Sequence, residues 1–79
     1  MLFDPFNARG AQVFDVEAER LLTRTFSVNT STGEVVRFHE PLRVEGGEVA
    51  SFTERYTTIH PIWAGQERPQ LFHCYGRVR

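Results

Sequence analysis

The clearest hydrophobic pattern in the chain is a pair of runs rich in β-branched and aromatic residues that flank the polar stretch NTSTG. Within that stretch, Asn29 can start a turn through its side chain, and Gly33 can adopt a positive φ at a bulge. The pattern therefore predicts an antiparallel hairpin in which Leu21–Val28 pairs with Glu34–His39. From the turn outwards, the expected register pairs Val28 with Glu34, Phe26 with Val36 and Arg24 with Phe38.

Side chains alternate between the two faces of a strand, so this register sorts the hairpin into an apolar face and a polar face. Such a hairpin belongs to an antiparallel sheet with one buried and one solvated side. The expected apolar face consists of Leu22, Phe26, Val28, Val36 and Phe38.

The stretch EVASFTERYTTIHPIW can be interpreted in two ways. Its large apolar residues recur at intervals of three, four and three, which is the spacing of one helix face. A strand would instead place Glu54 and Thr58 beside large aromatic residues, which is a poorer fit. We favour a helix over Val49–Ile59 that ends before His60-Pro61, because the residue before a proline avoids the helical region. A strand over the same residues is the alternative.

The remaining segments complete a small fold. Residues 1–10, punctuated by Pro5 and Gly10, predict an extended N-terminal arm with apolar anchors. AQVFDV and QLFHCYGRVR are strand candidates in a single domain over residues 11–79. The fold class we expect is α+β: a meander of about four antiparallel strands with one helix packed on one face. The alternative is an all-β small barrel.

Composition narrows the classes of function. The net charge of −1 excludes a strongly basic nucleic-acid binder and an acidic DNA mimic. No apolar run approaches the length needed to cross a membrane, and the first residues lack the features of a signal peptide. A single cysteine cannot form an internal disulfide. We expect a cytoplasmic protein, or one within a virion assembled in the cytoplasm.

Four residues are candidates for a reactive or metal site: His39, His60, His73 and Cys74. In a strand, His73 and Cys74 point to opposite faces, which disfavours a nucleophile–base pair at Cys74 unless His39 or His60 supplies the base. The ligand types suit zinc, so a small metal-binding protein is one alternative function, although no zinc-binding spacing is present. We interpret Cys74 as a small buried hydrophobe. We expect no cofactor, no metal and no enzymatic activity, since no two carboxylates are spaced as a paired acid and base.

A second alternative is nucleic-acid binding. His73, Tyr75, Arg77 and Arg79 could form an aromatic-basic strip along the last strand, where bases stack on rings and arginines contact phosphates. The near-neutral charge of the chain makes this the weaker prediction.

The favoured prediction is a non-enzymatic protein-protein interaction or assembly protein. Large apolar groups outside the expected sheet and helix form an exposed patch if they gather on one surface, and such a patch implies a partner. The partner is another protein or a second copy. A small bacteriophage-type minor structural or host-directed inhibitory protein is the concrete form we expect. The expected partner-binding residues are Phe3, Phe6, Trp63, Tyr75 and Arg77.

Overall fold

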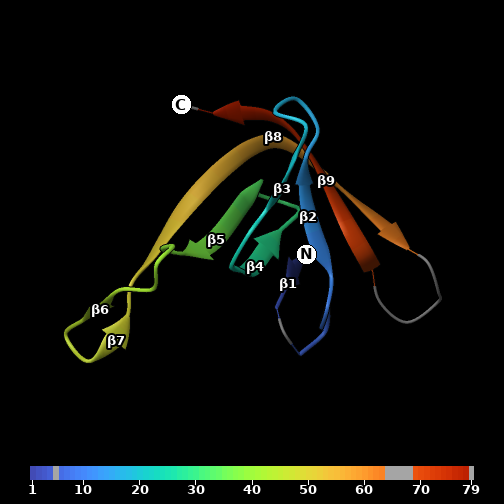
Figure 1. Ribbon diagram of the computed structural model, residues 1–79. Coiled ribbons are helices and arrows are strands. Elements are labelled where there is room, and N and C mark those ends of the chain that lie inside the picture. Colours follow the sequence, from blue (N-terminus) through green and yellow to red (C-terminus); the bar gives the residue numbers. More distant parts are fainter. Residues whose placement is uncertain (5, 64–68, 79) are drawn as a thin grey trace.

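The computed structural model describes residues 1–4, 6–63 and 69–78; Pro5 and Arg79 are among the residues outside this description. The described residues form nine strands and no helix. The strands are β1 (Leu2–Phe3), β2 (Gln12–Asp15), β3 (Arg20–Leu22), β4 (Thr25–Asn29), β5 (Glu34–Phe38), β6 (Val44–Glu45), β7 (Glu48–Val49), β8 (Ser51–Trp63) and β9 (Pro69–Val78). The fold is therefore all-β, and the α+β prediction is wrong (Figure 1).

The expected helix is the long strand β8, and a change of phase within this strand explains the error. Glu54 and Tyr56 are buried as alternating residues, but the next buried residue is Ile59. The phase changes at Thr57, which lies beside Gly76 of β9. Gly76 has a φ of 67°, and the Thr57 hydroxyl donates a hydrogen bond of 3.0 Å to the Tyr75 carbonyl. The buried residues of β8 are therefore spaced by two residues and then by three, and in the sequence this irregular spacing is mistaken for the period of a helix.

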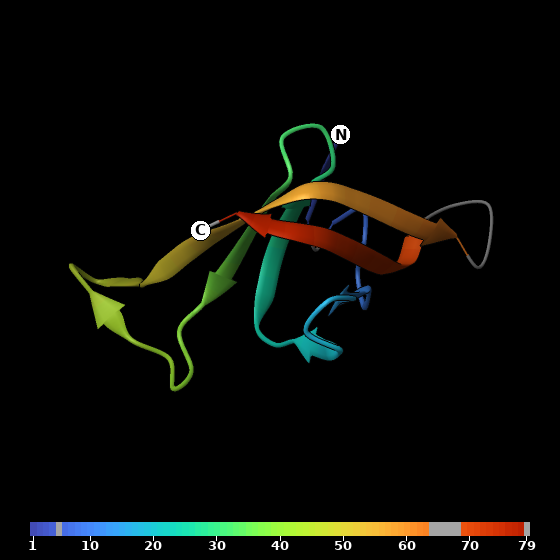
Figure 2. The same cartoon turned by 90° about the horizontal axis from the view of Figure 1, so that it is seen from above.

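Seven strands form one sheet in the order β1-β4-β5-β8-β9-β2-β3. All neighbours are antiparallel except β2 and β9, which are parallel. Strands β6 and β7 form a separate two-stranded hairpin that projects from the main body (Figures 1 and 2).

The sheet is strongly curled. In the strand order, β3 and β4 are separated by five inter-strand spacings, so in a flat sheet they would lie about 24 Å apart. The chain joins them through only Thr23 and Arg24, and three Cα steps span at most about 11 Å. Curling also brings Phe3 of β1 onto Phe72 of β9, with ring centroids 5.1 Å apart. The concave side holds the core, which consists of Phe3, Val13, Leu22, Val28, Val35, Tyr56, Ile59, Phe72 and Cys74.

The hairpin of β4 and β5 is present, with the positive φ expected at Gly33 (78°), but its register differs by one residue. Gly33 donates its N–H to the Asn29 carbonyl over 2.8 Å, so Asn29 pairs with Glu34 and Val28 with Val35. Of the apolar face expected on the hairpin, Leu22 and Val28 are buried, whereas Val35 takes the core position expected for Val36. A β-bulge at Phe26 places that ring against Phe38, outside the core.

Candidate functional site

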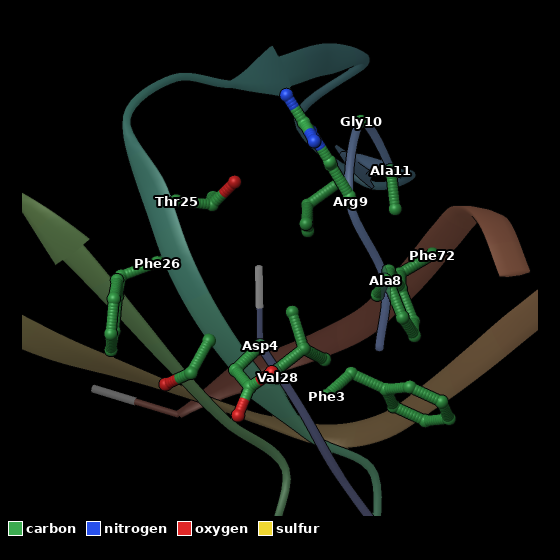
Figure 3. Close-up of a pocket in the computed structure, with 12 residues that line it drawn as sticks. Phe3, Asp4, Ala8, Arg9, Gly10, Ala11, Thr25, Phe26, Val28 and Phe72 are labelled. Carbon is green, nitrogen blue, oxygen red and sulfur yellow. The ribbon is translucent and has the colours of Figure 1, made fainter. Parts of the chain in front are cut away.

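A groove lies between β4 and the segment that leads into β2, and it has a volume of about 300 Å³ (Figure 3). Its base is apolar, because it is formed by buried core side chains from four strands: Phe3, Val13, Val28 and Phe72. One wall is formed by Thr25–Ser27 of β4, and the other by Ala8–Ala11. We call this space the β4 groove.

The β4 groove exists because β1 leaves β4 after two residues. Leu2 and Phe3 pair with Asn29 and Val28, but Asp4 begins a turn. The Asp4 N–H donates to Asn7 Oδ1 over 2.8 Å, and the Asp4 carbonyl accepts the Ala8 N–H over 2.9 Å. The Asp4 carboxylate accepts the N–H groups of Phe6 and Asn7. Because the turn engages the backbone of Asp4, β1 does not continue along β4.

Phe26 occupies a distinctive position on this open edge. In β4, Thr25 pairs with Arg37 of β5 and Ser27 with Val36, so Phe26 is the extra residue of the bulge. The extra residue of a bulge is left unpaired in the ladder. Phe26 also lies beyond the two residues that β1 covers. Phe26 borders the β4 groove, but its ring packs on Phe38 and points away from the groove interior (Figure 3), and the residue is 45% exposed.

Of the five expected partner-binding residues, the structure brings only Phe3 and Trp63 into an aromatic pair. Phe3 is buried, with 3% of its surface exposed, and packs on the protein's own core. Phe6 is 97% exposed and lies in the turn between Asp4 and Ala8, two residues that line the β4 groove. Trp63 is half-exposed, with its ring centroid 6.1 Å from that of Phe3. Tyr75 is exposed and has its ring edge-on to His73, whereas Arg77 pairs with buried Glu54.

Of the four candidate metal or reactive residues, only His60 and His73 are paired across neighbouring strands. They are register partners on β8 and β9, and the His73 ring also lies 5.9 Å from that of Phe14. Cys74 is fully buried, as expected. His39 packs on Phe52 at a different part of the sheet. Within the described ranges, no group of three or more histidine, cysteine, aspartate or glutamate side chains is arranged to hold a metal ion.

A buried polar cluster surrounds the Tyr56 hydroxyl. This hydroxyl lies 3.2 Å from Asp15 Oδ2 and 3.4 Å from Glu54 Oε2, within hydrogen-bond distance of both carboxylates. Burial raises the pKa of the Tyr56 hydroxyl above its usual range, and the negative charges of Glu54 and Asp15 raise it further. Burial also raises the pKa of the Cys74 thiol to about 12, with smaller contributions from Asp15 and Glu54.

Two arginines complete this cluster and explain how it is tolerated in the core. Arg37 forms an ion pair with Glu54 Oε1, and Arg77 Nη2 lies 3.1 Å from Glu54 Oε2. A buried carboxylate is tolerated when it is paired and hydrogen-bonded. The two arginines balance the charges of Asp15 and Glu54. The two carboxylates and the Tyr56 hydroxyl are buried, and only Arg77 reaches solvent, so the geometry is that of a structural network.

Sequence reasoning missed this cluster, because it treated the carboxylates as unpaired and Glu54 as a misfit in a strand. Asp15 and Glu54 lie on β2 and β8, which are distant in sequence and come close because both strands pair with β9. The sequence signal for this cluster was the pair Glu54 and Tyr56, two large polar residues at alternate positions. If the segment had been assigned as a strand, both side chains would have been predicted to face the core.

The described part of the chain contains no helix that could span a lipid bilayer. No protein-family model, curated protein or solved structure matches this chain. Function is therefore inferred from the geometry of the chain itself.

Proposed function

We propose that this protein is a non-enzymatic protein-binding protein and that the β4 groove is its binding site. The observation that carries the proposal is a groove with an apolar base beside the part of β4 that β1 does not cover. The exposed ring of Phe26 lies at the rim of this groove, on the outer side of β4. Exposed aromatic groups at an apolar depression mark a surface that gains free energy when a partner covers it.

The burial of the acid-base groups supports the non-enzymatic part of the proposal. Asp15, Glu54 and Tyr56 are the closest approach to a catalytic constellation in the described residues, and all three are shielded from solvent. A substrate could reach them only if the core opened. The partner that we propose is another protein or a second copy of the chain, in a cytoplasmic setting that suits the unpaired thiol of Cys74.

Two parts of the sequence-based prediction are left out of this proposal. The bacteriophage assignment gains no support from the fold or from the comparisons, so we do not retain it. Nucleic-acid binding through the last strand is also weakened, because Arg77 pairs with Glu54 instead of standing free beside Tyr75. Arg79 lies outside the described residues.

The proposal is tested by selecting binders from a displayed library of short random peptides on the immobilised wild-type protein. The affinities of the selected peptides are then measured by fluorescence anisotropy for the wild type and two variants. Phe26→Ser removes the exposed aromatic ring at the rim of the β4 groove. The matched control, Val44→Ser, removes a side chain that is 70% exposed on the remote β6–β7 hairpin.

We expect Phe26→Ser to weaken binding by about tenfold or more, which corresponds to about 1.4 kcal/mol, the scale of an interface contact. Val44→Ser should leave binding unchanged. Selected peptides that bind equally well to the wild type and to Phe26→Ser would contradict the proposal. Thermal melting of each variant establishes that it is folded before its affinity is compared.

A further inference from the structure

We infer that the ligand of the β4 groove is an extended peptide segment that adds to the open edge of β4 as a β-strand, antiparallel to it. The inference rests on the proposed function and specifies the chemistry of the partner. Its basis is the edge left open where β1 turns away at Asp4. An unpaired strand edge binds another chain through main-chain hydrogen bonds, and adjacent pockets for side chains add selectivity.

The bulge at Phe26 indicates where the added strand would pair. Val28 and Asn29 have register partners on both sides, whereas, among the residues that the structure describes, Thr25 and Ser27 have partners only in β5. Within the same described residues, Phe26 has a register partner on neither side. A chain that continued the path of β1 would lie along these three residues. The adjacent volume of about 300 Å³ would accept one bulky apolar side chain, because its base is made of Phe3, Val28 and other core residues.

The charges at the two ends of the β4 groove favour one direction of the added strand. Figure 3 shows Arg9 toward the Thr25 end and Asp4 beside Val28 at the other end. β1 runs from Asn29 toward Val28, so a strand that continues its direction would have its C-terminal side near Arg9. The peptide that fits is therefore a short extended segment with a bulky apolar residue and, C-terminal to it, an acidic group.

The test uses the peptides selected from the random library on the full-length protein. Each peptide is resynthesised with single N-methyl groups along its backbone, because N-methylation removes one main-chain donor and leaves the side chains intact. A peptide that pairs with β4 should lose about tenfold or more in affinity at alternating positions, since alternate residues face the partner strand. Arg9→Ala should weaken peptides with a C-terminal acidic group by about threefold or more and leave their neutral analogues unchanged.

The possible outcomes separate this inference from the proposed function. Sensitivity to Phe26→Ser together with an alternating N-methyl pattern supports both. Sensitivity to Phe26→Ser with a flat N-methyl profile, or with peptides that become helical when bound, overturns strand addition and leaves the groove as a binding site. Binding that is insensitive to Phe26→Ser, or a selection that yields no binder, overturns both.

Discussion

Replacing Gly33 by alanine should destabilise the protein by about 3 kcal/mol, because two costs coincide at this residue. Gly33 has a φ of 78°, a conformation that residues with a Cβ rarely adopt. It also lies directly against β8: its carbonyl accepts the Tyr56 N–H over 2.7 Å. A Cβ at Gly33 would overlap the Tyr56 carbonyl oxygen and lie 3.0 Å from the carbonyl carbon.

The two costs can be separated with a second glycine. Gly10 has nearly the same φ, 79°, but a Cβ there would meet no atom within 4 Å. Gly10→Ala therefore carries only the conformational cost, about 1–2 kcal/mol. Gly33→Ala adds the overlap with the backbone of β8, which costs a further 1–3 kcal/mol, roughly the range for overpacking. The difference between the variants reports the contact between the hairpin turn and β8.

Circular dichroism with urea and thermal unfolding measures this difference. For a domain of this size, 1 kcal/mol corresponds to a shift in Tm of about 4–8 °C. Gly33→Ala should therefore melt roughly 8–16 °C below Gly10→Ala if the overlap costs about 2 kcal/mol. Equal melting temperatures for the two variants would refute the packing of the turn on β8, even if both variants were less stable than the wild type.

Further predictions concern the N-terminal segment, the thiol and the buried ion pairs. Phe3→Ala should cost about 3–5 kcal/mol in urea unfolding, because it empties a core site, whereas Phe6→Ala should change stability by less than about 0.5 kcal/mol. Because the pKa of the Cys74 thiol is raised to about 12, the unfolded thiol loses its proton near pH 9 while the folded thiol keeps it. The free energy of unfolding should then fall as pH rises from 9 to 12 in denaturation experiments, by up to about 1.4 kcal/mol per pH unit from this group, and Cys74→Ala should remove this contribution and leave that of Tyr56 above pH 10. Glu54→Gln should cost about 3–5 kcal/mol, because it leaves Arg37 without its buried partner. Glu34→Gln, which removes an exposed pair at 4.0 Å, should cost less than about 1 kcal/mol on the same urea scale, and equal costs for the two glutamine variants would contradict the assigned role of the buried cluster.

The hairpin shows how far local sequence signals reach. The turn chemistry of Asn29 and Gly33 predicted the hairpin and the positive φ at Gly33, because both depend on neighbouring residues alone. The register differed by one residue, since Asn29 itself closes the turn with the Gly33 N–H. The bulge at Phe26 depends on pairing with β5 and had no local signal.

The incorrect helix in β8 has a different origin. The 3.6-residue period arose from a strand whose buried face changes at Thr57, beside a left-handed Gly76. That change depends on the partner strand, so no window of the sequence contains it. The same holds for Glu54, which appeared unsuited to a strand because its partners, Arg37 and Arg77, lie on β5 and β9.

The N-terminal segment and the candidate site also depended on long-range contacts. Both phenylalanines of this segment were predicted to bind a partner, yet Phe3 is buried in the protein's own core and Phe6 is exposed. The difference arises because β1 pairs with β4 for only two residues before Asp4 turns the chain away. The β4 groove results from that turn and the curl of the sheet together. The sequence pattern could therefore indicate an exposed aromatic group but not the groove beside it.

The most direct test of the central claim is a nuclear magnetic resonance titration of the ¹⁵N-labelled full-length protein with a peptide selected from the random library. If the β4 groove is the binding site, the largest amide shift changes should fall on Thr25–Ser27 and on Ala8–Ala11, the two walls of the groove. The β6–β7 hairpin should stay unchanged. Shift changes confined to that hairpin, or to the sheet face that carries His60, His73 and Tyr75, would contradict the account.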